Sequence, residues 1–256
     1  MDFHNGYFVK KCEKIESLSV LKLQVCNLIR EEFNIECDDD EKVLNQFHEF
    51  VNEVSAIDLN EKRMLLIKKI NQNINFKELI FNSFKDTILD LLGPDLLVQK
   101  NCNIVIQMPN DNNPSELHRD APGNSSYEVV IWIPLVDCYK TKSMYIVDYK
   151  STLELYEDLE KNPDWEHFEK KSIEKSSSVP VKFGEALFFS TAVLHGSHIN
   201  KEAETRISLN IRFKNIFSPS GLKNQLQFFE KFFISDFVKI GSSLELKKLI
   251  LQNEKI

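Results

Sequence analysis

Three side chains in the second half of the chain are of the types that hold a catalytic metal ion. His118 and Asp120 are two residues apart, so in an extended segment both side chains project to the same side. His195 follows a short apolar segment much later in the chain. Two imidazoles and one carboxylate are the protein ligands of the facial triad in non-haem Fe(II) oxygenases, which leaves three coordination positions open. The same three residues are also a possible zinc site of a hydrolase.

Polar and apolar residues alternate strictly over residues 206–213, RISLNIRF. This alternation places Arg206, Ser208, Asn210 and Arg212 on one face of a strand and the apolar residues on the other. A half-exposed strand with its polar face in water is the ordinary interpretation. If the polar face points inward instead, a guanidinium and a hydroxyl two residues apart can hold a carboxylate through charge-assisted hydrogen bonds. The distal carboxylate of 2-oxoglutarate, whose keto-acid end chelates iron, needs such a buried cation.

The elements that position these residues differ between the two halves of the chain. Apolar residues between 13 and 92 recur at helical spacing, and Gly93 followed by Pro94 ends the last of these helices. From residue 97 the pattern changes to short runs with a period near two, separated by turn-like stretches. The expected strands are 98–108, 128–135, 143–147, 179–183, 186–189, 192–195 and 206–213.

Further helical segments are expected within and after the strands. Residues 151–171 form a charged insertion, predicted to be a solvated helical excursion, with a lid over the mouth of the core as the alternative. Two amphipathic stretches, 222–239 and 243–253, follow Pro219. We therefore predict a mainly β core with flanking helices (α+β), in which seven or eight short strands form a sandwich or barrel.

The length and composition predict one globular domain, or one domain with helical additions. The chain has 256 residues, 42% of them hydrophobic, and a formal net charge of −7, which argues against a protein that coats nucleic acid. The longest apolar run is much shorter than a membrane helix, and the first residues lack the apolar core of a signal peptide. A cytoplasmic location is therefore expected. The five cysteines contain no C-x-x-C pair and are expected to be reduced and mostly buried.

Taken together, the motifs resemble a known enzyme superfamily over residues 100–215. His118-Arg119-Asp120, His195-Gly196-Ser197 and Arg206-Ile207-Ser208 resemble the Fe(II)/2-oxoglutarate-dependent dioxygenases. Within that superfamily, LHRD, VVIWIPL, FGEALFF and LHGSHIN are most similar to the phytanoyl-CoA dioxygenase-like branch. The stretch SSYEVVIWIPLVDCYKTKSMYIV is also similar to oxygenases of bacterial surface-carbohydrate gene clusters.

The resemblance implies a double-stranded β-helix, or cupin-like jelly roll, with N- and C-terminal helices. Together with the helical periodicity on either side, it predicts a single oxygenase domain (1–256) of helical support (1–95), a jelly-roll core with the insertion 151–171 (96–216) and C-terminal helices (217–256). The cofactors that it implies are Fe(II), the co-substrate 2-oxoglutarate, and O2.

The resemblance also assigns roles to individual residues. His118, Asp120 and His195 are the implied iron ligands. Arg206, assisted by Ser208, is the implied partner of the distal carboxylate of 2-oxoglutarate. Trp132 lines the co-substrate cavity, is a core aromatic residue, or serves in both ways. Gln107 and Asn103 share one face of an early strand and either reach the cavity or pair structurally.

The implied reaction is hydroxylation of a small molecule, with decarboxylation of 2-oxoglutarate to succinate and CO2. Related halogenases replace the iron carboxylate with a small residue, so the presence of Asp120 favours hydroxylation or a related oxidation. The expected substrate is a polar metabolite such as a sugar or nucleotide-linked sugar of surface polysaccharide biosynthesis, with Arg119, Lys140, Lys142 and Arg212 as possible anion contacts. Neither nucleic acid nor a membrane is an expected partner. The alternatives are an acyl-thioester hydroxylase and a non-catalytic jelly-roll binding protein.

Overall fold

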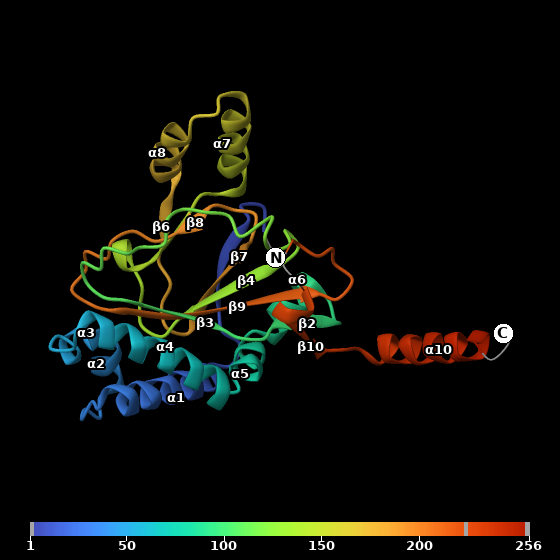
Figure 1. The fold of residues 1–256 in the computed structure, drawn as a ribbon, viewed down its shortest axis with the longest axis horizontal. Helices are drawn as coiled ribbons and strands as arrows, with labels where there is room; N and C mark the ends of the chain where they lie inside the picture. The colour runs from blue at the N-terminus through green and yellow to red at the C-terminus, as the bar shows by residue number, and fades with distance from the viewer. Residues whose placement is uncertain (1–2, 223–224, 254–256) are drawn as a thin grey trace.

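Two antiparallel sheets form the centre of the molecule (Figure 1). The computed structural model describes residues 3–222 and 225–253. The seven-stranded sheet has the order β1-β7-β4-β9-β2-β10, and β3 also pairs with β9; the smaller sheet has the order β6-β5-β8. The strands of the large sheet are β1 (Tyr7–Lys11), β2 (Leu96–Gln99), β3 (Asn103–Gln107), β4 (Val129–Pro134), β7 (Glu185–Ser190), β9 (Arg206–Asn215) and β10 (Phe229–Phe233). Those of the small sheet are β5 (Met144–Ile146), β6 (Ser177–Val179) and β8 (His195–Gly196). The predicted mainly β core with flanking helices, a double-stranded β-helix, is confirmed.

Strand β9 is the central strand that explains the alternating pattern seen in the sequence. Its apolar residues Ile207, Leu209, Ile211 and Phe213 are fully buried. Phe213 packs against Phe81 of an N-terminal helix, with ring centroids 6.4 Å apart. The apolar face of β9 therefore lies under the helices, and its polar face lies on the inner side of the sheet. This is the inward arrangement, and not the half-exposed strand of the ordinary interpretation.

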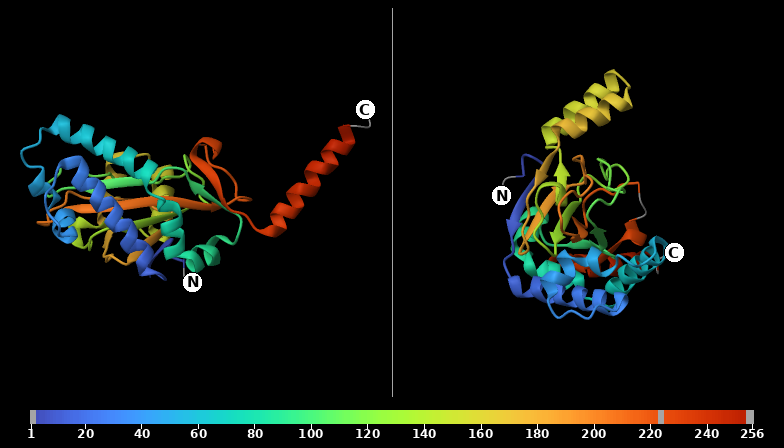
Figure 2. Two further views of the ribbon diagram at one scale, coloured as in Figure 1. Left: turned by 90° about the horizontal axis from the view of Figure 1, so that it is seen from below. Right: turned by 90° about the vertical axis from the view of Figure 1, so that its left-hand side faces the viewer.

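The helical prediction for the first third of the chain is confirmed. The helices are α1 (Ile15–Phe33), α2 (Asp40–Asn45), α3 (Phe47–Phe50), α4 (Ala56–Asn73), α5 (Phe76–Ser83) and α6 (Lys85–Leu92). They lie against one side of the large sheet, as the right-hand view of Figure 2 shows. Helix α6 ends at Gly93, whose φ of +71° is a conformation that glycine adopts without strain and whose N–H donates to the carbonyl of Leu89.

Five details of the strand and helix prediction are wrong. The strand expected at 192–195 begins only at His195 and continues to Gly196. Residues 7–11 were not expected to form a strand, yet β1 pairs along the whole of its length with β7. The single strand expected at 98–108 is two strands, β2 and β3, which lie one after the other along the same edge of β9. A strand was expected at 179–183, but the strand observed there, β6, ends at Val179. The helix expected at 222–239 is interrupted by β10, which pairs with β2.

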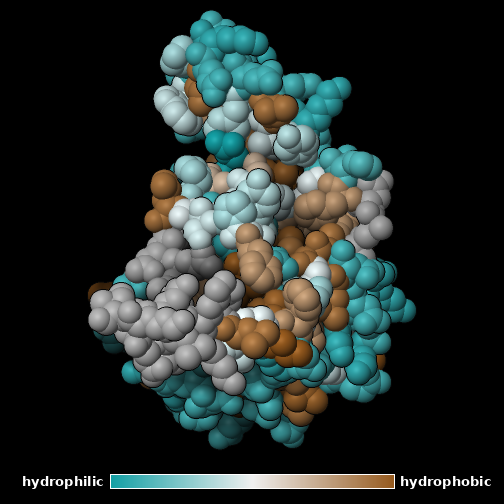
Figure 3. All heavy atoms as spheres, turned by 90° about the vertical axis from the view of Figure 1, so that its right-hand side faces the viewer, coloured by the Kyte–Doolittle hydropathy of each residue, from teal (hydrophilic) through white to brown (hydrophobic). Residues whose placement is uncertain are grey.

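Two helical segments project from this core (Figure 1). The insertion forms a hairpin of α7 (Tyr149–Lys161) and α8 (Trp165–Lys175), with a small core of its own that includes Leu155 and Phe168. Its outer surface is largely hydrophilic (Figure 3), as expected of a solvated excursion. After the short α9 (Gln225–Phe228) and β10, helix α10 (Asp236–Asn253) extends away from the sheets. Within the described residues, no helix is both long enough and apolar enough to cross a bilayer.

The cysteines provide a direct test of the packing. All five are free, and burial raises the pKa of Cys26, Cys102 and Cys138 to about 12. Since the thiolate is the reactive form, we expect iodoacetamide to modify Cys37 and, more slowly, Cys12 in the native protein. The three buried thiols should react only after denaturation. Peptide mass spectrometry measures this order, and fast native labelling of Cys138 would contradict the packing described here.

Candidate metal centre and cofactor cavity

His118 and His195 are brought together by their backbones. The two residues form an isolated antiparallel bridge, in which each N–H donates to the other's carbonyl at 3.0 Å. Residues that face each other in an antiparallel pair project to the same side. The two imidazole rings accordingly lie with their centroids 4.6 Å apart. A pairing between residues 77 positions apart in the sequence thus places two ligand-type side chains side by side.

The hydrogen bonds of both rings leave the same nitrogen free. His118 Nδ1 lies 2.7 Å from the carbonyl oxygen of Glu116, and His195 Nδ1 lies 3.0 Å from that of Val193. A carbonyl oxygen only accepts, so each Nδ1 carries a proton, and Nε2 is the nitrogen of each ring that remains for a metal. Burial lowers the pKa of His195 to about 4, so its ring is neutral at pH 7. Both rings are therefore in the tautomer that binds a metal through Nε2.

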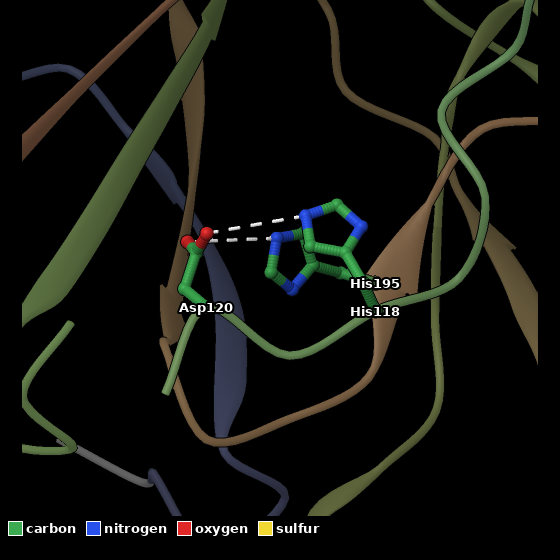
Figure 4. Close-up of side chains that lie close together, drawn as sticks. All are labelled: His118, Asp120 and His195. Carbon is green, nitrogen blue, oxygen red and sulfur yellow. Dashed lines mark ion pairs between the residues drawn. The ribbon is translucent and has the colours of Figure 1, made fainter. Parts of the chain in front are cut away.

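Asp120 completes the cluster (Figure 4). Its Oδ1 is 3.9 Å from His118 Nε2, and its Oδ2 is 3.7 Å from His195 Nε2. Arg212 Nη2 donates to the same Oδ2 at 2.6 Å. Burial opposes ionisation of Asp120, but the charge of Arg212 outweighs it and holds the pKa of this carboxyl below its usual value. Within the described residues, this is the only group of three or more such side chains with ligand atoms close enough together to hold one metal ion.

Gly196 allows the segment before His118 to lie close against β8. A Cβ at Gly196 would come within 2.7 Å of the carbonyl oxygen of Ser115 and 2.8 Å of that of Glu116. Ser197 N–H donates to that Ser115 carbonyl at 2.8 Å, and Ser115 N–H donates to Ser197 Oγ at 2.9 Å. The close approach that only glycine permits thus fixes the loop that carries His118.

A cavity of about 470 Å³ opens beside the three side chains. Its walls come from the inner faces of β3, β4 and β9, from the loop before His118, and from α4. Among the residues that line it are the three of the cluster together with Gln107, Trp132 and Arg206. Ser208, which lies between Arg206 and Asn210 on the inner face of β9, is absent from the lining, as are the possible anion contacts Arg119, Lys140 and Lys142.

Arg206 is a buried cation without a carboxylate partner in the part of the chain that the structure describes. It is 2% exposed, and its only hydrogen bond among the described residues goes from Nη1 to the carbonyl of Ser143, at 3.3 Å. Its Nε and the neighbouring Ser208 Oγ are both buried without a partner. Burial lowers the pKa of Arg206, but a guanidinium remains charged at neutral pH. The cavity therefore contains a positive charge that an anion can satisfy, and a buried hydroxyl without a partner lies next to that charge on β9.

The other predicted residues are placed as follows. Trp132 is 1% exposed and lies 6.0 Å from the Arg206 guanidinium carbon, so it is both a core residue and a cavity wall. Gln107 donates to the carbonyl of His198 at 2.7 Å, while its Oε1 is buried without a partner. Asn103 also lines the cavity. For Gln107, structural pairing and access to the cavity are therefore compatible, while Asn103 reaches the cavity from the exposed start of β3.

Some expectations for the charged residues are wrong. Lys142 is fully buried and binds Glu204 at 2.7 Å, so it is not an anion contact in the cavity. Arg119 stacks on Tyr156 of α7, with its guanidinium carbon 3.5 Å from the ring centroid. Sequence reasoning missed Arg63 of α4, which lines the cavity from the N-terminal helices. Nothing in the local sequence around Arg63 distinguishes it from a surface residue.

The donor set fits Fe(II) and 2-oxoglutarate. Two imidazoles and one carboxylate match the ligand preference of non-haem iron. Six buried side-chain polar atoms among the described residues lack a partner, and five of them belong to Gln107, Arg206, Ser208, Asn210 and Arg212 on β3 and β9. An unsatisfied buried group costs about 1–3 kcal/mol, so their concentration on the cavity side indicates a site built for a polar ligand.

A jelly roll with two histidines and one aspartate beside a basic cavity defines the class of non-haem Fe(II)/2-oxoglutarate-dependent oxygenases. The family model described as "Phytanoyl-CoA dioxygenase (PhyH)" matches residues 29–208. The chain belongs to this family and is an oxygenase of that class. No curated protein sequence matches it significantly.

Solved structures support the fold. The non-haem monooxygenase ThoJ in its nickel complex has a TM-score of 0.54 and 16% identity, with 99% of this chain and 98% of that chain covered. EctD from S. alaskensis, in its apo form, has a TM-score of 0.55 and 13% identity, with 86% and 78% covered. AviO1 from Streptomyces viridochromogenes Tue57 has a TM-score of 0.50 and 14% identity, with 86% and 94% covered. At these identities the likeness concerns the fold alone.

Proposed function

We propose that His118, Asp120 and His195 hold the Fe(II) of this oxygenase and that Arg206 binds the distal carboxylate of 2-oxoglutarate. The observation that carries this assignment is the pairing of a metal-type cluster with a buried, uncompensated guanidinium in one cavity. An isolated buried cation is costly, and an anionic ligand offsets that cost. Ser208 Oγ, two residues along the same face, supplies a further hydrogen bond to the carboxylate.

Within this assignment each residue has a definite task. The iron supplies the oxidising chemistry when it is bound with 2-oxoglutarate and O2. The carbonyls of Glu116 and Val193 keep Nδ1 of the two histidines protonated, which leaves both Nε2 atoms free to bind the metal. Trp132 forms an apolar wall beside Arg206 and excludes water from its ion pair. Because Asp120 occupies the carboxylate position, hydroxylation or a related oxidation is favoured over halogenation.

For the substrate we propose a small polar metabolite, such as a sugar or a nucleotide-linked sugar. The support is the lining of the cavity, which contains the amides Asn103, Asn113 and Asn210 and the cation Arg63. Asn210 Oδ1 is buried without a partner and can accept from a ligand hydroxyl. A role in surface polysaccharide biosynthesis rests only on the resemblance of residues 125–147. An acyl thioester is the second candidate, since the neighbouring cavity of about 260 Å³ includes Leu117, Phe168 and Ile173 in its lining.

One experiment tests both the proposed iron- and 2-oxoglutarate-dependent activity and the proposed substrate. The protein is loaded anaerobically with Fe(II) and 2-oxoglutarate, candidate metabolites are added, and O2 is admitted. We expect succinate to form only with iron present and to form faster with a true substrate, which gains 16 mass units on hydroxylation. Mass spectrometry follows both products, and a chelator is the control.

The alternatives predict different results in the same assay. A non-catalytic jelly-roll protein forms no succinate with any candidate. A zinc hydrolase acts without 2-oxoglutarate and without O2, and it leaves Arg206 and Ser208 without a task. An acyl-thioester hydroxylase adds oxygen to the acyl compound and is not stimulated by sugars.

A further inference from the structure

Arg212 makes contacts that the proposed function does not explain. It lies on β9, six residues after Arg206 and on the same inner face. Its Nη2 donates to Asp120 Oδ2 at 2.6 Å, and its Nη1 donates to Gln99 Oε1 of β2 at 3.3 Å. The side chains of Arg212 and Asp120 are 13% and 12% exposed, so this is a largely buried ion pair.

We propose that Arg212 is a positioning residue that aligns the Asp120 carboxylate for metal binding. The inference rests on the proposed metal site. Arg212 donates to Oδ2, whereas Oδ1, 3.9 Å from His118 Nε2, accepts no hydrogen bond from the described residues and is the oxygen that we assign to the ion. The carboxylate is thereby set to bind through one oxygen, as the open facial triad requires.

The need for such a residue follows from where Asp120 lies. Asp120 follows the His118 bridge in a stretch without regular secondary structure, so no strand or helix fixes its side chain. Arg212, in contrast, is on the central strand, opposite Val130 of β4, and Gln99 holds its other end. The ion pair therefore anchors the Asp120 carboxylate, which is on a loop, to the central strand of the sheet.

The ion pair also sets the charge of the site. Arg212 balances the charge of Asp120, so the ion pair adds no net negative charge to a bound divalent ion. A metal centre that keeps its full positive charge attracts the dianion 2-oxoglutarate more strongly than one neutralised by an unpaired carboxylate. Arg212 is thus expected to favour co-substrate binding as well as metal alignment.

The test uses Co(II) as an anaerobic probe of the apo protein, read by titration and by its visible ligand-field bands. We expect Arg212→Gln to weaken Co(II) binding about tenfold and to change the shape and intensity of the bands, since loss of a group that orients a metal ligand typically costs 10–100-fold in affinity. Arg212→Lys keeps the charge but loses the planar fork, and should restore part of the affinity. Gln99→Met should weaken binding less, and its effect should not add to that of Arg212→Gln.

Arg119→Gln is the matched control, because Arg119 is in the same loop as Asp120 but stacks on Tyr156. It should leave affinity and spectrum unchanged. Wild-type Co(II) affinity and bands in a folded Arg212→Gln protein, or tighter binding, would overturn the positioning role while leaving the proposed function intact. If the wild-type protein itself binds no Co(II), the proposed metal site fails instead. Circular dichroism establishes that each variant is folded.

Discussion

The His195→Ala protein is expected to lose Fe(II) binding, with an affinity more than about 100-fold below that of the wild type. In the proposed site His195 is one of three protein ligands, and its Nε2 lies 3.7 Å from Asp120 Oδ2 at a position that is 5% exposed. The two remaining ligands lie in a single three-residue segment and cannot enclose the ion from both sides. Titration of the apo protein with Fe(II) under anaerobic conditions, or with Co(II), measures the loss. Succinate formation should fall to the background level without added iron.

His198→Ala is the matched control for this experiment. His198 is three residues away, but its ring packs against Tyr145 with centroids 3.9 Å apart, and it does not line the metal cavity. The variant should therefore keep the wild-type metal affinity. If His195→Ala binds iron as tightly as the wild type, or if His198→Ala loses it equally, the three-residue cluster is not the metal site.

The candidate metal-binding and anion-binding residues could be predicted from the sequence because they lie in local patterns. The two-residue spacing of His118 and Asp120 and the alternation over 206–213 both follow from the period of an extended chain. What no local pattern contains is the bridge between His118 and His195, which depends on a pairing across many residues. The contact between Arg212 and Asp120 likewise exists only after the sheet has formed.

The errors in the fold prediction have the same physical origin. The segment at 7–11 is short, and it is a strand because β7 offers it an edge. Residues 229–233, FEKFF, have apolar spacing that suits either a helix or a strand, and pairing with β2 decides between them. The turn at 100–102 that separates β2 from β3 carries no glycine or proline to mark it. Tertiary pairing overrides local preference in each case.

The Arg206→Ala protein is expected to bind Fe(II) normally but to require about 100-fold more 2-oxoglutarate. Removing one partner of a buried, hydrogen-bonded charge pair leaves the other charge uncompensated, and the distal carboxylate would be that charge. The proposed metal ligands lie elsewhere in the cavity and keep their own partners. The KM for 2-oxoglutarate in the succinate assay, with iron saturating, measures the effect. The KM of Arg206→Lys should lie between those of the wild type and Arg206→Ala, because lysine keeps the charge but not the bidentate geometry.

The stability of the apo protein separates this role from a structural one. Arg206 has no carboxylate partner among the described residues, so its removal should not lower the melting temperature of the ligand-free protein. 2-Oxoglutarate with a redox-inert divalent metal should raise the melting temperature of the wild type and not that of Arg206→Ala. Ser208→Ala, which removes only a neutral hydrogen bond, should raise the KM by a smaller factor, about tenfold or less. An Arg206→Ala protein that melts far below the wild type yet keeps the wild-type KM would show that this guanidinium supports the fold and not the co-substrate.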